Sequence, residues 1–228
     1  MADNRGVLLP VYIVADESFS MKSLERDLND GLASLHESLR TEPMTAAKVR
    51  IAVLGFSDDV AVRMKLTDVR TERELPRVTI RGGTSYVAAF QDLLTRIPGD
   101  VANLKSEGYK VHRPTVFFLS DGQPTDGEGS WQIPHQQLVD KTRTPVAPNV
   151  IAFGLGQALA ETILAVATRQ DFAFMAVPGV NLGEAIRKFF ETLTSSVVES
   201  GRAIANGDPE VVIERPDPDV VRMAIDFV

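Results

Sequence analysis

The amino-acid sequence predicts an α/β fold: a doubly wound, mainly parallel sheet with one antiparallel edge strand, in a single domain. Short apolar runs alternate with amphipathic helical segments as far as residue 200. This alternation is typical of a parallel sheet with helices on both faces. The length of 228 residues suits one such domain with a well-buried core.

Each element of the first half follows from a local pattern. Residues 7–15 are apolar almost throughout, which predicts a strand covered on both faces, and leucines at steps of three or four over residues 24–39 predict a helix. Residues 49–57 and 60–67 predict a hairpin, and the half-polar second strand suits an edge of the sheet. A second helix is expected over residues 84–97, with a hydroxyl residue as its N-cap.

The second half repeats this order. The predicted strands lie at 115–122, 149–156 and 172–177, and the predicted helices at 133–142, 158–169 and 182–199. We therefore expect the domain to cover residues 7–200 and residues 201–228 to form a C-terminal extension. The turn residues and short β-leaning runs of this extension fit a hairpin, a strand added to a partner's sheet, or a loosely ordered arm.

Composition disfavours several classes of function. The chain has 31 acidic residues against 24 Lys and Arg, a net charge of −7, and no basic stripe that could follow a nucleic-acid backbone. It has no cysteine and three dispersed histidines, which disfavours a zinc hydrolase. Its apolar runs are shorter than the ~18 residues of a membrane span, and its start lacks a secretory cleavage pattern. We expect a cytoplasmic protein that binds neither nucleic acid nor membrane.

Oxygen-bearing side chains occur where three predicted elements begin or end. Asp16, Ser18 and Ser20 follow the first strand, Thr84 opens the second helix, and Asp121 lies at the end of the fourth strand. Sites in open α/β sheets form outside the carboxyl ends of the strands. If the first and fourth strands are neighbours, these residues converge. Carboxylate and hydroxyl oxygens without sulfur or imidazole suit a hard cation such as Mg²⁺.

The same segments resemble a known family. DESFSM (16–21), GGT (82–84) and LSDG (119–122) look like the three parts of the metal-ion-dependent adhesion site of von Willebrand factor A (VWA) domains. The resemblance covers the whole predicted domain. In more detail, SDGQPTD (120–126) and FSDDVAV (56–62) are similar to bacterial tellurium-resistance-type VWA proteins.

The resemblance implies a Mg²⁺ site, with Mn²⁺ or Ca²⁺ as alternative ions. Ser18, Ser20 and Thr84 would bind the cation directly, and Asp16 and Asp121 directly or through water. The glycine pair before the threonine would let the backbone approach the ion. An acidic side chain of a partner protein would complete the coordination. The expected function is metal-dependent protein binding without catalysis, in a tellurium-resistance or stress-response system.

Other interpretations of these residues remain open. Phe19 stands where the family often has glycine, and it restricts the loop to negative φ or forms an apolar rim for a partner. Asp16 also resembles an aspartyl nucleophile, so a metal-dependent phosphatase or phosphotransferase is an alternative, as is a metal-independent assembly protein. Taken singly, Thr84 or Ser85 would be an N-cap. Glu17 as a general base is disfavoured, because no nucleophile-activating histidine lies near it.

Overall fold

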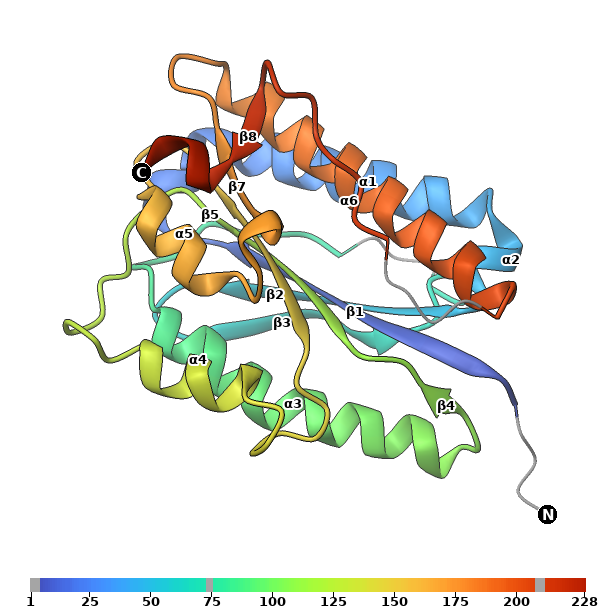
Figure 1. Cartoon of the computed structure of the whole chain (residues 1–228). Coiled ribbons are helices and arrows are strands. Elements are labelled where there is room, and N and C mark those ends of the chain that lie inside the picture. The colour runs from blue at the N-terminus through green and yellow to red at the C-terminus, as the bar shows by residue number, and fades with distance from the viewer. Residues whose placement is uncertain (1–4, 73–75, 208–211) are drawn as a thin grey trace.

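A computed structural model confirms the predicted α/β architecture and describes residues 5–72, 76–207 and 212–228 (Figure 1). The strands are β1 (Val7–Asp16), β2 (Val49–Phe56), β3 (Val60–Thr67), β4 (Lys110–Val111), β5 (Thr115–Ser120), β6 (Asn149–Gly154), β7 (Ala173–Ala176) and β8 (Val221–Met223). The helices are α1 (Glu25–Arg40), α2 (Pro43–Ala46), α3 (Tyr86–Ser106), α4 (Gln132–Val139), α5 (Ala160–Val166) and α6 (Leu182–Ala205). The 3₁₀ turns are η1 (Phe19–Leu24), η2 (Gln170–Phe172) and η3 (Ala224–Phe227).

The strands form one sheet in the order β3-β2-β1-β5-β6-β7-β8, and β4 also pairs with β1. From β2 to β7 the neighbours run parallel, so the first strand and the strand that precedes Asp121 lie side by side, as the site prediction requires. Both outer strands, β3 and β8, run antiparallel to their neighbours. The sequence predicts one antiparallel edge; β8 supplies the second because part of the C-terminal tail returns to the sheet.

Helices cover both faces of the sheet. In Figure 1, α1 and α6 lie on one face and α3 and α4 on the other. Buried side chains accordingly form two apolar cores, one beneath α1 and α6 and one beneath α3, α4 and α5. The helices α1 and α6 approach closely at Gly31, where a Cβ atom would lie 2.0 Å from Cδ2 of Phe190. Within the described residues, no helix has both the length and the apolarity needed to cross a bilayer.

Pro10 lies inside β1 without interrupting it. On the β2 side, Leu9 N–H donates to Lys48 O at 2.8 Å. On the other side, pairing with β4 ends opposite Leu8, and pairing with β5 begins opposite Val11. Pro10, which has no N–H to donate, therefore falls where β1 changes partners.

The C-terminal tail joins the same chain's sheet. The predicted boundary at residue 200 falls inside α6, which continues to Ala205. Val221–Met223 then pairs with β7, with Phe174 opposite Met223. The turn predicted near residues 207–209 lies partly outside the described residues, which resume at 212.

Candidate metal centre

The carboxyl ends of β1 and β5 bring the first site residues together. Asp16 ends β1 and Ser120 ends β5, and Ser120 Oγ donates a 2.6 Å hydrogen bond to Asp16 Oδ2. The other carboxylate oxygen, Oδ1, accepts from the Ser18 N–H at 2.8 Å. Asp16 is fully buried, so these two contacts fix the orientation of its carboxylate.

Hydroxyl groups extend this arrangement to the second predicted acid. Ser18 Oγ and Ser20 Oγ lie 2.9 Å apart, and Ser20 Oγ donates a 2.6 Å hydrogen bond to Asp121 Oδ1. Four of the five predicted ligands, Asp16, Ser18, Ser20 and Asp121, are thus linked in one chain of contacts, called here the oxygen cluster.

The fifth residue, Thr84, is connected to the same loops through the backbone. Phe19 N–H donates to Gly82 O at 2.9 Å, and Thr125 N–H donates to Thr84 O at 2.9 Å. The loop before α3 therefore contacts both the loop after β1 and the loop after β5. Thr84 is buried, and its hydrogen bonds within the described chain all involve its backbone atoms. The Thr84 hydroxyl is consequently available to bind a cation through its oxygen.

Ser85, and not Thr84, caps α3. Ser85 Oγ accepts a 3.0 Å hydrogen bond from the Ala88 N–H, which is the contact of an N-cap side chain. The same Oγ donates to Asp126 Oδ1 at 2.7 Å. The capping function that the sequence left open between the two residues therefore belongs to Ser85.

Burial makes both acids of the oxygen cluster harder to ionise. Desolvation raises the pKa of Asp16 to about 6, although hydrogen bonds from Ser120 and Ser18 act in the opposite direction. Desolvation also raises the pKa of Asp121 above its ordinary value. A carboxylate removed from water is stabilised in its charged form by a nearby positive charge. A cation at this position would supply that charge.

The donor set fits a hard divalent cation. Oxygens at neighbouring corners of an octahedron with Mg–O bonds of about 2.0–2.1 Å lie roughly 2.9 Å apart, which matches the 2.9 Å between Ser18 Oγ and Ser20 Oγ. Across the described residues, no group of three or more His, Cys, Asp or Glu side chains could hold a metal ion. The cluster thus offers hydroxyls and two carboxylates, a set that suits Mg²⁺ better than a soft metal and leaves coordination positions for outside ligands.

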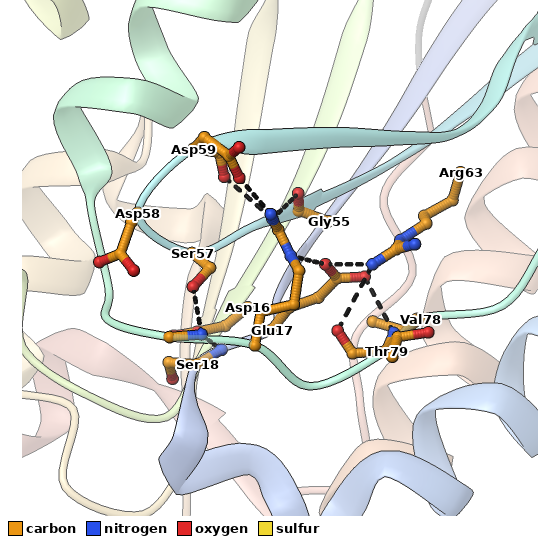
Figure 2. Close-up of polar contacts among 12 residues, drawn as sticks. Asp16, Glu17, Ser18, Gly55, Ser57, Asp58, Asp59, Arg63, Val78 and Thr79 are labelled. Atoms are coloured by element: carbon orange, nitrogen blue, oxygen red, sulfur yellow. Dashed lines mark hydrogen bonds and ion pairs between the residues drawn. The ribbon is translucent and has the colours of Figure 1, made fainter.

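Glu17 lies between Asp16 and Ser18 in the sequence, but its side chain points away from the oxygen cluster and pairs with arginines (Figure 2). Arg63 donates from Nε to Oε1 and from Nη2 to Oε2, each at 2.7 Å. Arg81 Nε donates to Oε2 at 2.8 Å, and the Thr79 N–H donates to Oε1 at 3.0 Å. Each oxygen of this fully buried carboxylate therefore accepts two hydrogen bonds. This saturation further disfavours Glu17 as a general base, a role that the sequence already disfavours.

Arg81 connects Glu17 to the β2–β3 turn. Its Nη2 donates to Gly55 O at 3.1 Å and to Asp59 O at 3.0 Å, and its Nη1 pairs with the Asp59 carboxylate. The Arg81 guanidinium therefore contacts both the Glu17 and the Asp59 carboxylates. The hairpin predicted from the sequence is thus held to the segment that precedes α3.

The glycine pair makes room for an aspartate. A Cβ atom at Gly82 would lie 2.1 Å from Asp58 Oδ2, and one at Gly83 would lie 2.6 Å from Asp58 Oδ1. Asp58 Oδ1 accepts from the Gly83 N–H at 3.1 Å, and Ser57 Oγ accepts from the Gly82 N–H at 2.8 Å. The side chain that the backbone approaches here is Asp58, and the close approach of these glycines to an ion stays a prediction.

Comparison with known proteins agrees with the observed fold. Residues 11–123 match a family model described as the von Willebrand factor type A domain. The pilus adhesin SpaC from Lactobacillus rhamnosus GG, in its open conformation, has a similar structure, with a TM-score of 0.66 and 13% identity over 86% of this chain and 31% of that one. No curated protein sequence matches the chain.

Two further solved structures resemble the chain. Proximal thread matrix protein 1 from the mussel byssus, with a zinc-occupied MIDAS motif, has a TM-score of 0.59 and 16% identity over 85% of this chain and 48% of that one. A von Willebrand factor type A protein from Catenulispora acidiphila has a TM-score of 0.55 and 13% identity over 85% and 43%. The chain spans less than half the length of each of these proteins. At such identities the likeness shows a common fold.

Proposed function

This chain belongs to the von Willebrand factor type A family, and on that premise we propose that it is a metal-ion-dependent protein-binding module. In this proposal, Ser18, Ser20 and Thr84 bind Mg²⁺ through their hydroxyls. Asp16 and Asp121 bind the ion directly or through water. An acidic side chain of a partner protein completes the coordination shell, and Mn²⁺ and Ca²⁺ are the alternative ions.

The oxygen cluster is the observation that most supports this proposal. The spacing of its two hydroxyl oxygens matches that of neighbouring ligands in an octahedral Mg²⁺ shell. Its two carboxylates balance the charge of a divalent cation. A third carboxylate from outside can then enter without a large excess of negative charge. The zinc-occupied MIDAS motif of the mussel byssus protein is a precedent for a divalent ion in this fold.

Phe19 gives the proposed binding face an apolar contact. Its side chain is 65% exposed, and its backbone N–H is fixed by Gly82 O at 2.9 Å. Among the described residues only glycines have positive φ, so the bulky residue fits this loop without strain. Lys22 Nζ lies 5.2 Å from the ring centroid. We propose a partner segment that carries an apolar side chain next to its acid.

The proposal includes no catalytic step. Both Asp16 carboxylate oxygens accept hydrogen bonds and the side chain is fully buried, which disfavours it as a phosphatase nucleophile. The cytoplasmic location rests on the sequence pattern, and the link to tellurium resistance or a stress response rests on the sequence resemblance. Both form part of the same proposal.

Calorimetric titration of the whole chain with MgCl₂ and with MnCl₂ tests the metal site. We expect one binding site in the wild type, its loss in Asp16→Ala, and its retention in Asp171→Ala, a control acid that pairs with Arg169 on the surface. Equal binding by wild type and Asp16→Ala, or no binding to either ion, would overturn the proposal. Turnover of a generic phosphoester with Mg²⁺, abolished by Asp16→Ala, would favour a phosphatase.

A further inference from the structure

We propose that Glu17 is a positioning residue of the metal centre, and that Arg63 and Arg81 act through it. The three residues form the Glu17 cluster. In this inference, which rests on the proposed function, the cluster fixes the loop that presents Ser18 and Ser20, although none of its members binds the ion.

The Glu17 cluster ties together segments that are distant in the sequence. Arg63 lies on β3, 46 residues from Glu17, and Arg81 lies in the segment before α3, 64 residues from Glu17. Thr79, from that same segment, adds its backbone N–H. Figure 2 shows Arg63 and Thr79 beside the Glu17 carboxylate. The edge hairpin, the segment before α3 and the loop after β1 are therefore joined at a single side chain.

Backbone contacts on both sides of Glu17 extend this link to the ligands. Arg81 N–H donates to Glu17 O at 2.7 Å, and Glu17 N–H donates to Phe56 O at 2.8 Å. Phe19 N–H donates to Gly82 O at 2.9 Å. The residues before and after Ser18 are thus attached to neighbouring segments. A displacement of Glu17 would move the adjacent Ser18 hydroxyl, since one peptide unit separates them.

The fold provides a built space for the Glu17 carboxylate. A Cβ atom at Gly55 would lie 2.0 Å from Cδ of Glu17 and 2.1 Å from its Oε1. The carboxylate is fully excluded from solvent, whereas the Arg63 and Arg81 side chains are partly exposed. A buried carboxylate that loses a cationic partner is strongly unfavourable and tends to leave its site. Removal of either arginine is therefore expected to release Glu17 and loosen the loop.

The positioning effect and the simple effect of charge have opposite signs. Replacing an arginine by an uncharged residue removes a positive charge near the ion, so charge alone would strengthen cation binding. Loss of loop position would weaken it, because ligands must be held within a narrow geometry around Mg²⁺. The direction of the change in cation affinity therefore separates the two effects.

The test compares Arg63→Met with Arg96→Met in the whole chain. Arg96 also forms a pair of 2.7 Å hydrogen bonds to one carboxylate, that of Asp92 on α3, and its side chain is 23% exposed against 22% for Arg63. We expect Arg63→Met to weaken Mn²⁺ binding in calorimetry by roughly tenfold, as loss of residues that orient metal ligands does. Arg96→Met should bind as the wild type does. If Arg63→Met does not fold, Arg63→Lys, which keeps the charge and loses the paired geometry, should weaken binding in the same direction.

A second readout needs no metal. Hydrogen exchange of the Phe19 amide should become faster in Arg63→Met and stay unchanged in Arg96→Met. The Leu155 amide, which donates to Ser120 O at 2.9 Å, is the internal reference. Tighter Mn²⁺ binding by Arg63→Met, or unchanged binding with only a lower melting temperature, would overturn the inference. If the wild type binds no ion, the proposed function fails, and unchanged exchange at Phe19 in Arg63→Met would then refute the positioning role by itself.

Discussion

Ser20 Oγ donates a 2.6 Å hydrogen bond to Asp121 Oδ1 and so connects two residues that are 101 positions apart in the sequence. This contact joins the loop after β1 to the loop after β5 at the carboxyl edge of the sheet. The hydroxyl and carboxylate oxygens are therefore close enough to bind the same cation.

Ser20→Ala should weaken Mg²⁺ or Mn²⁺ binding by about tenfold or more, equivalent to about 1.4 kcal/mol, because one oxygen donor is lost. Unfolding without metal should change by only about 1 kcal/mol, the net value of one hydrogen bond. Calorimetry and urea denaturation measure the two effects. Ser106→Ala is the control, since Ser106 Oγ donates to Asn103 O at the exposed end of α3, away from the oxygen cluster. Equal cation affinity in Ser20→Ala and wild type would contradict the prediction.

Adjacent substitutions at the start of α3 should have different effects. Ser85→Ala removes the N-cap hydrogen bond to the Ala88 N–H and the contact with Asp126, so it should lower the free energy of unfolding by about 1–2 kcal/mol. Thr84→Ala keeps the cap and should instead reduce cation affinity. Urea denaturation and calorimetry of both variants test this division. The prediction is wrong if Thr84→Ala destabilises the fold as much as Ser85→Ala and leaves cation binding intact.

Gly55→Ala should be strongly destabilising, because its Cβ atom would overlap the buried Glu17 carboxylate. Overpacking of this kind costs about 1–3 kcal/mol, and displacement of a paired charge adds to it. Gly99→Ala is the matched control: Gly99 lies within α3, and among the described residues outside its own helix backbone and its two chain neighbours, no atom lies within 4 Å of an added Cβ. That change should stabilise the helix by about 0.5–1 kcal/mol. Thermal and urea denaturation should show opposite signs for the two variants, and equal signs would refute the clash.

His135 should make folding stability depend on pH. Its Nε2 lies 2.8 Å from Val166 O, its ring contacts Phe90 and Trp131, and burial lowers its pKa below 6.5. The unfolded chain therefore binds the proton first as pH falls through about 6.5, and stability is lost below that pH. His135→Gln removes this titration.

The measurement is the difference in free energy of unfolding between wild type and His135→Gln at pH 7.5 and at pH 5.5. As the pH falls below the pKa of His135 in the unfolded chain, the wild type should lose free energy of unfolding relative to His135→Gln. The loss should reach up to about 1.4 kcal/mol per pH unit. Taking the difference cancels the opposite trend from Asp16 and Asp121, whose pKa values are raised. A difference that does not change with pH would show that His135 titrates normally in the folded chain.

Local patterns were enough to predict most of the sheet. The apolar run at 7–15 corresponds to Val7–Asp16, and the run at 60–67 to Val60–Thr67, because buried and edge strands differ in the alternation of their side chains. The helix predicted at 158–169 is shorter, Ala160–Val166, because Ala167 adopts an extended backbone with ψ of 142°. The sequence does not predict strand β8 of the C-terminal extension, because three residues are too few to form a recognisable strand pattern.

The site was predictable only where its chemistry is local in the sequence. Asp16, Ser18 and Ser20 form a short motif, and Asp121 follows an apolar strand. The partners of Glu17 carry no such signal: Arg63 and Arg81 meet it only because the hairpin and the segment before α3 pack beside β1. The spacing of these residues in the sequence does not indicate that they lie close together in the fold. The oxygen cluster could therefore be anticipated, and the Glu17 cluster could not.

The two ends of the sheet bear on how molecules of this chain meet one another. An uncovered sheet edge presents unpaired N–H and C=O groups, to which a second molecule can add a strand. Here β3 carries Arg63 and Lys65 on one outer edge, and the other ends in β8, only three residues long. Charge and shortness are two ways in which natural proteins discourage stacking into fibrils. Both ends of this sheet are thus protected against edge-to-edge aggregation.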